Sequence, residues 1–189
     1  MRLFAGIEID DTVRERAAAI AESASAAIDR ALSIRWVPSQ NLHITLWFFG
    51  EVPEPDAANI LSVIDHPFLA SSFDLHVAGL GAFPQSGIPR ALWLGVKTGG
   101  DSLMRLHAEL ATRLRPLGLE PERRPLSPHM TLARVKGVLS GAPPREVRAL
   151  WRDLPADAGS CRVNALTLFR SRLSPKGAAY EPLVRVPLM

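Results

Sequence analysis

Apolar and polar residues alternate along many stretches of this chain, and the alternation predicts a protein rich in β-strands. A period of two is typical of a strand that buries one face and exposes the other. The alternating runs span residues 2–9, 41–49, 73–83, 91–97, 129–135, 162–173 and 180–188. A shorter extended piece, 34–37, ends at Pro38.

Segments with helical periodicity separate these predicted strands. The first helix is expected to begin at Asp10–Thr12, whose side-chain oxygens can cap a helix, and to end near Leu32. A helix that follows 99–101 has leucines at helical spacing and is expected to stop at 116–118. The other predicted helices run from 53–56 to about 64 and from 143–144 through 151, and tight turns are predicted at 84–89 and 174–177.

The order of these elements is similar in the two halves of the chain: helix, strand, helix and then a hairpin. We therefore predict an α+β fold of two similar lobes related by a pseudo-two-fold axis. Antiparallel sheets should line a central cleft, with the helices outside. A chain of 189 residues suits one such bilobal unit spanning 1–189, and no linker composition divides it.

A repeated tetrapeptide is the main chemical signal. His43-Ile44-Thr45-Leu46 lies within the strand 41–49, and His129-Met130-Thr131-Leu132 follows 86 residues later within 128–135. Residues two apart on a strand share a face, so each imidazole should lie beside a threonine hydroxyl. One such pair occurs often by chance, but two of the five histidines of this chain share the same register.

Two facing His-Thr pairs can act on a phosphodiester without a metal ion. Hydrolysis of a cyclic phosphodiester needs a base to deprotonate water, an acid for the departing oxygen, and donors to the equatorial oxygens. Histidine serves as acid or base near neutral pH, and hydroxyls donate to phosphate. Neither motif has further His, Asp or Glu at ligand spacing, so we expect no metal and no cofactor.

Composition limits the other classes of protein. No run approaches the ~20 apolar residues that span a bilayer, and acidic residues near the start argue against a secretion signal. The single cysteine, Cys161, excludes an intramolecular disulfide and favours a reducing cytoplasm. A formal net charge of +3, carried mostly by arginine, permits contact with phosphates but does not establish it. We expect a monomer that contacts no membrane.

The chain resembles the 2H phosphoesterase superfamily, and within it the RNA 2′,3′-cyclic phosphodiesterases that are also called 2′-5′ RNA ligase-like proteins. The resemblance runs almost end to end. It rests on the segments 2–4, 36–38, 41–46, 48–52, 79–84, 89–96, 128–134 and 168–171, together with Gly177 and Tyr180.

The resemblance implies an enzyme that opens a 2′,3′-cyclic phosphate at an RNA end and leaves a 2′-phosphate. It implies His43 as the proton donor to O3′, His129 as the proton acceptor, and Thr45 and Thr131 as phosphate contacts. The residues alone do not decide which histidine has which role.

Three further residues are candidate substrate contacts. Phe4 and Arg134 lie in segments that carry the resemblance. Strict alternation puts Arg134 on the face opposite His129, so it reaches the phosphate only if the strand bends. Trp47 replaces a common lysine of the family; alternation puts it on the face of His43, where it would stack on a base or cover the sheet rim.

Two alternatives stay open at this point. The same fold could act on 2′-5′ oligonucleotides or small cyclic nucleotides. The chain could also bind RNA ends without catalysis, although a binder has no need of two titratable groups. Turnover of a 2′,3′-cyclic nucleotide in the presence of a chelator separates these alternatives.

Overall fold

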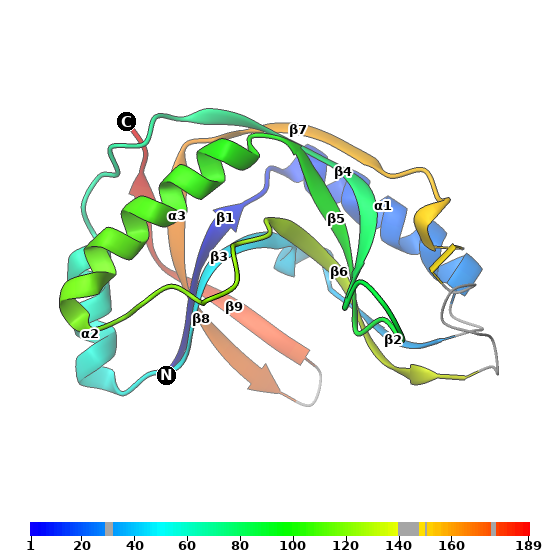
Figure 1. The fold of residues 1–189 in the computed structure, drawn as a ribbon, viewed down its shortest axis with the longest axis horizontal. Helices are drawn as coiled ribbons and strands as arrows, with labels where there is room; N and C mark the ends of the chain where they lie inside the picture. The colour runs from blue at the N-terminus through cyan, green and yellow to red at the C-terminus, as the bar shows by residue number, and fades with distance from the viewer. Residues whose placement is uncertain (29–31, 140–147, 150, 175–176) are drawn as a thin grey trace.

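A computed structural model describes residues 1–28, 32–139, 148–149, 151–174 and 177–189. Within these ranges the chain forms one nine-stranded antiparallel sheet with helices on its outer side (Figure 1). The strands are β1 (Arg2–Glu8), β2 (Leu32–Trp36), β3 (His43–Glu51), β4 (Phe73–Phe83), β5 (Ala91–Thr98), β6 (His129–Val138), β7 (Asp157–Val163), β8 (Ala165–Ser174) and β9 (Gly177–Pro187). The helices are α1 (Asp11–Ile28), α2 (Glu54–Ile64) and α3 (Gly100–Leu114), with 3-10 turns η1 (Ser39–Asn41) and η2 (Arg115–Leu117).

The strand order is symmetric about the middle of the sheet. It runs β7-β4-β5-β6-β3-β1-β8-β9, with four strands on each side of the boundary between β6 and β3. Only one residue pair, Ile44 with Met130, joins the two central strands. Beyond that pair the strands separate, and β2 pairs with β6 instead. The predicted α+β fold of two related halves is therefore confirmed, although its strands form one continuous sheet.

Helices α1 and α3 each cover one half of the sheet, and the strand before each of them belongs to the other half. Helix α1 follows β1 but packs against β7, and α3 follows β5 but contacts β3. Helix α2 lies beside α3, as Figure 1 shows. The core-facing leucines of α3, predicted from their spacing, are all fully buried: Leu103, Leu106, Leu110 and Leu114. None of the helices in the described part of the chain is long and apolar enough to cross a bilayer.

Most predicted elements are present with nearly the predicted bounds, and one is split. The backbone N–H of Val13 donates to Asp10 Oδ1 (2.8 Å), which confirms the capped start of α1. The run predicted over 162–173 contains the end of β7 and most of β8, because the chain passes at Asn164 from one half of the sheet to the other; residues 157–161 of β7 were not predicted as a strand. Most of the helix predicted over 143–151, and the middle of the turn 174–177, lie outside the described residues.

Candidate active site

The two motif strands lie side by side at the centre of the sheet, and each presents a histidine and a threonine to the same cleft. Ile44 and Met130 point the opposite way and are fully buried. The cleft has a volume of about 490 Å³ and is lined by His43, Thr45, His129 and Thr131. The structure thus brings together the four residues that the repeat singled out.

A β-bulge in each motif strand changes which residues follow the threonines into the cleft. In β6, Leu92 and Trp93 of β5 pair with Ala133 and Thr131, so Leu132 is an extra residue. Leu132 and Ala133 are both buried, and Arg134 returns to the face of His129 and lines the cleft. The placement of Arg134 on the opposite face, predicted by strict alternation, is wrong because of this bulge.

The same bulge occurs in β3 and removes Trp47 from the cleft. Ala5 and Gly6 of β1 pair with Trp47 and Thr45, so Leu46 is the extra residue. Trp47 is only 8% exposed and packs against His107 of α3 at 5.5 Å between ring centres. The prediction that Trp47 shares the face of His43 is therefore wrong. Phe48, 48% exposed, lies in the cleft instead.

Backbone carbonyls fix the orientation of both imidazoles in the same way. Nδ1–H of His43 donates to the carbonyl of Asn41, and Nδ1–H of His129 donates to that of Ser127, each at 2.7 Å. In both cases the acceptor lies two residues before the histidine. Because a carbonyl accepts only, Nδ1 carries the proton in the neutral ring and Nε2 is the basic nitrogen. Nε2 of His43 lies 2.9 Å from the Thr45 hydroxyl.

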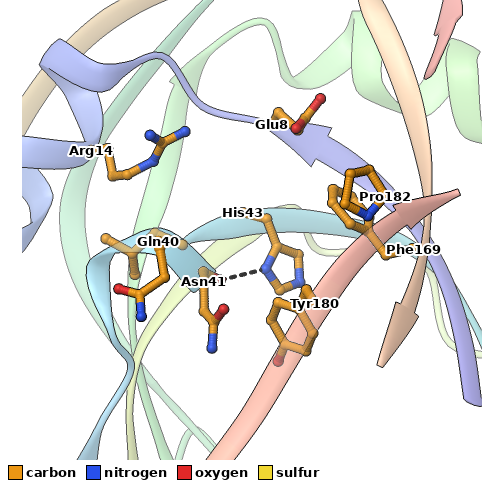
Figure 2. A pocket seen from close by; sticks show the side chains of 9 residues that line it. Glu8, Arg14, Gln40, Asn41, His43, Phe169, Tyr180 and Pro182 are labelled. Carbon is orange, nitrogen blue, oxygen red and sulfur yellow. Dashed lines mark hydrogen bonds between the residues drawn. The ribbon is translucent and has the colours of Figure 1, made fainter. Parts of the chain in front are cut away.

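Aromatic rings surround the two imidazoles. Phe4 is 4.7 Å and Tyr180 5.1 Å from the ring centre of His43, and Figure 2 shows that imidazole between Asn41 and Tyr180. His129 has Phe83 at 5.0 Å and Trp93 at 5.8 Å. Phe4 is 3% exposed and also stacks on Phe169, so it supports His43 and exposes little surface to the cleft.

Burial and neighbouring charge make both imidazolium ions more acidic than usual. Burial lowers the pKa of His43 most, and the positive charges of His129 and Arg134 lower it further, against the opposing hydrogen bond to Asn41. The pKa of His129 is lowered by burial and by Arg134, against the hydrogen bond to Ser127. A free enzyme near neutral pH therefore holds mostly neutral rings, and a bound phosphate anion would raise both pKa values.

The cleft is cationic. Arg2, Arg35 and Arg134 line it, and no carboxylate side chain belongs to its lining within the described residues. Arg2 lies over the Phe48 ring, with its guanidinium carbon 4.8 Å from the ring centre. Across the described ranges, no three His, Cys, Asp or Glu side chains gather closely enough to hold a metal ion. Cys161 is buried, and burial raises the pKa of its thiol, which does not suit a nucleophile.

Two smaller hollows adjoin the cleft. One of about 180 Å³ lies beside His43 and is lined by Glu8, Arg14 and Tyr180, among others (Figure 2). Glu8 is the cross-strand partner of His43, but its carboxylate accepts from the Thr167 hydroxyl at 2.9 Å. The other hollow adjoins Thr45 and His129 and includes the carboxylates of Glu120 and Glu122.

The alternation pattern missed several residues that line the cleft or contact the imidazoles. Tyr180 and Trp93 lie in segments that carry the family resemblance, but their distance from the motifs in sequence hides the contact. Phe48 could have been found from the repeat itself, because it precedes Arg134 by the same 86 residues that separate the histidines. No sequence signal placed Arg35 beside Arg134.

A symmetric antiparallel sheet with a His-Thr pair on each central strand defines the class of protein: a 2H phosphoesterase. The family model described as the 2′-5′ RNA ligase superfamily matches residues 10–174, and the chain belongs to this family. An Aeropyrum pernix protein named RNA 2′,3′-cyclic phosphodiesterase is 37% identical over 81% of this chain and 85% of its own length. A protein of the same name from Archaeoglobus fulgidus is 34% identical over 97% and 98%.

Solved structures of similar proteins have the same fold. A Thermus thermophilus protein superposes with a TM-score of 0.76 at 28% identity, covering 99% of this chain and 97% of its own. The E. coli LigT protein in complex with 3′-AMP gives a TM-score of 0.74 at 26% identity, with 99% and 97% coverage. The family resemblance stated from the sequence is therefore confirmed.

Proposed function

We propose that this protein hydrolyses the 2′,3′-cyclic phosphate at the end of an RNA to a 2′-phosphate, using its two histidines as acid and base and no metal ion. The observation that carries the proposal is the pair of carbonyl-oriented imidazoles that line one cationic cleft with two threonines. The names of the relatives from Aeropyrum and Archaeoglobus support the same reaction.

In the proposed reaction the two imidazoles exchange protons with opposite sides of the phosphorus. Neutral His129 accepts a proton at Nε2 from the attacking water as the new P–O bond forms. Protonated His43 gives its Nε2 proton to O3′ as the P–O3′ bond breaks. After the reaction His129 is protonated and His43 neutral, so proton exchange with solvent restores the starting state.

The remaining cleft residues bind the charge and the nucleoside. The Thr45 and Thr131 hydroxyls and the Arg134 guanidinium donate to the non-bridging oxygens, where charge develops in the transition state. Arg134 also lowers the pKa of His43, which makes the imidazolium a stronger acid toward O3′. Phe48 takes the stacking role that was one of the two alternatives for Trp47, because Phe48 has the exposed ring.

The assignment of His43 as donor and His129 as acceptor follows the family resemblance, and the pH profiles of the variants described below test it. Both motifs come from one chain, so the site needs no second copy, which supports the expected monomer. A cytoplasmic location fits the single buried thiol. Sedimentation of the purified protein tests the monomer.

A product assay tests the proposed function. A short RNA ending in 2′,3′-cyclic phosphate is incubated with protein in excess EDTA, and the phosphate isomer is identified by ³¹P NMR. We expect turnover to the 2′-phosphate. A variant with both histidines changed to alanine, purified in parallel, reveals any contaminating nuclease.

Three results would contradict parts of this proposal. Activity that EDTA abolishes and added divalent metal restores would contradict the metal-free reaction. A 3′-phosphate product would mean that O2′ leaves instead of O3′. Binding of the cyclic end without turnover would make the protein an RNA-end binder.

A further inference from the structure

Two arginines lie side by side on the cleft face of the sheet. Arg35 of β2 is the direct backbone partner of Arg134 of β6. Directly paired residues of antiparallel strands point to the same face, with Cβ atoms about 5 Å apart. Both residues line the cleft that contains His43 and His129. Arg134, which lies next to the two histidines, is therefore one of two adjacent arginines in the cleft.

The guanidinium of Arg35 lies toward the outer end of the cleft. Its Nη2 is 3.0 Å from the position that a Cβ at Gly177 would occupy. Gly177 begins β9, and Tyr180, three residues further along that strand, packs against His43. Three strand residues span about 10 Å, so Arg35 lies beside β9 at a distance of this order from the residue that packs against His43.

Both guanidinium groups are permanently charged, because arginine does not lose its proton in proteins. The planar guanidinium fork matches phosphate oxygens, so such a pair is suited to two neighbouring phosphates.

The hollow on the other side of Thr45 and His129 has a different charge. Glu120 and Glu122 line it together with Arg124. Two carboxylates would repel a chain of phosphates at close range. Both smaller hollows that adjoin the cleft have a carboxylate in their lining, whereas the described lining of the cleft past Arg35 has none, so the direction past Arg35 suits a polynucleotide.

We propose that Arg35 binds the phosphodiester immediately upstream of the cyclic phosphate, so that the enzyme selects cyclic phosphates at polynucleotide ends over free cyclic mononucleotides. This inference rests on the proposed function, in which Arg134 and the histidines hold the cyclic phosphate. The terminal ribose then spans the interval between Arg134 and Arg35.

Three substrates with the same terminal base test the inference: the cyclic mononucleotide, its 5′-phosphorylated form, and a dinucleotide with a cyclic 3′ end. We expect kcat/KM to be about 10- to 100-fold higher for the dinucleotide than for the mononucleotide, the value of a charged hydrogen-bonded contact. The 5′-phosphorylated form should show most of this gain, because the phosphate and not the added nucleoside provides it.

Substitution of Arg35 tests whether this side chain provides the gain in kcat/KM. Arg35→Gln should reduce the ratio of dinucleotide to mononucleotide kcat/KM to near one, and Arg35→Lys, which keeps the charge but loses the fork, should give an intermediate ratio. Arg162→Gln is the matched control: Arg162 is exposed on β7, paired with Asp74 at 3.2 Å, and lies outside the cleft. It should keep the wild-type ratio.

Several outcomes would overturn the inference. Equal kcat/KM for all three substrates in the wild-type enzyme would do so and leave the proposed function standing. A gain for the dinucleotide alone would assign the preference to stacking of the second nucleoside. An Arg35→Gln variant that loses activity equally on every substrate would place Arg35 in the reaction or in the fold. Absence of turnover on all three would overturn the proposed function, and this inference with it.

Discussion

Each imidazole has one nitrogen fixed by a backbone carbonyl, so its other nitrogen, Nε2, is the atom able to exchange a proton with substrate or water. Replacing His43 or His129 with alanine removes one proton transfer and should lower kcat by roughly 10²-fold or more. Circular dichroism of each variant checks that the fold is retained. A variant that keeps near-full activity would show that its imidazole transfers no proton.

The direction of both histidine pKa shifts predicts where the pH optimum lies. The proposed mechanism requires one protonated ring in the free enzyme, and both pKa values lie below the ordinary 6.5. The maximum of kcat/KM should therefore fall below pH 6.5, and not at neutrality as histidine chemistry alone suggests. The maximum of kcat should lie at higher pH, because bound phosphate raises both pKa values.

The same profiles assign the two roles. Loss of the acidic limb in His129→Ala and of the basic limb in His43→Ala would agree with the proposed acceptor and donor. The opposite pattern would exchange the roles of the two histidines. Profiles with both limbs unchanged would contradict acid–base catalysis by either residue.

At the residue scale the sequence predicted the His-Thr pairs but not all of their neighbours. A period of two is reliable only while a strand is regular, and each motif strand has an extra residue directly after its threonine. The bulges reverse the alternation, so Trp47 is buried while Phe48 and Arg134 face the cleft. No residue of the tripeptide that follows either threonine is the glycine that often marks a bulge.

At the scale of elements, packing between β4 and β5 determines how closely the rings around His129 can pack. Gly81 is the cross-strand partner of Trp93, and a Cβ at Gly81 would lie 2.1 Å from the indole ring. Gly81→Ala should destabilise the protein by about 1–3 kcal/mol, as overpacking does. It should also lower kcat, because Trp93 contacts His129.

Urea unfolding and steady-state kinetics measure the two effects. Gly137→Ala in β6 is the control, because nothing lies within 4 Å of its added Cβ. That variant should stay within about 0.5 kcal/mol of wild type. Wild-type stability and activity in Gly81→Ala would mean that Trp93 can move without affecting His129.

Element prediction succeeded where hydrophobic period and turn residues agree. Helix α3 has both buried leucines at helical spacing and a stop at Pro116–Gly118, and its bounds agree with the prediction. The boundary between β7 and β8 at Asn164 has neither glycine nor proline. The chain changes sides of the sheet there, a tertiary event that a local pattern cannot report.

At the scale of the whole molecule, the buried histidines make stability depend on pH. Burial lowers the pKa of His43, His107 and His129 in the folded state, whereas the unfolded chain titrates near 6.5. Below pH 6.5 the unfolded state binds more protons than the folded state. The stabilising effect of the three histidines is therefore complete above pH 6.5 and is lost as pH falls through their folded-state pKa values.

Urea unfolding at about pH 7.5 and about pH 5.5 tests this dependence. The unfolding free energy of the wild type should decrease toward the lower pH. The decrease should be smaller in the double variant His43→Ala/His129→Ala, which lacks two of the three groups. An equal decrease in both proteins would show that other groups cause it.

The placement of both central strands in one polypeptide has a consequence for the direction in which a substrate can bind. In a homodimer built from two identical halves, every residue beside one histidine would have an identical copy beside the other. Such a site would accept a ligand equally well in two orientations. Here Phe48 and Arg134 occupy corresponding positions on the two sides, one apolar and one charged. A single chain can break its symmetry in this way, and the proposed site would hold the base of a nucleotide on the Phe48 side and its phosphate on the Arg134 side.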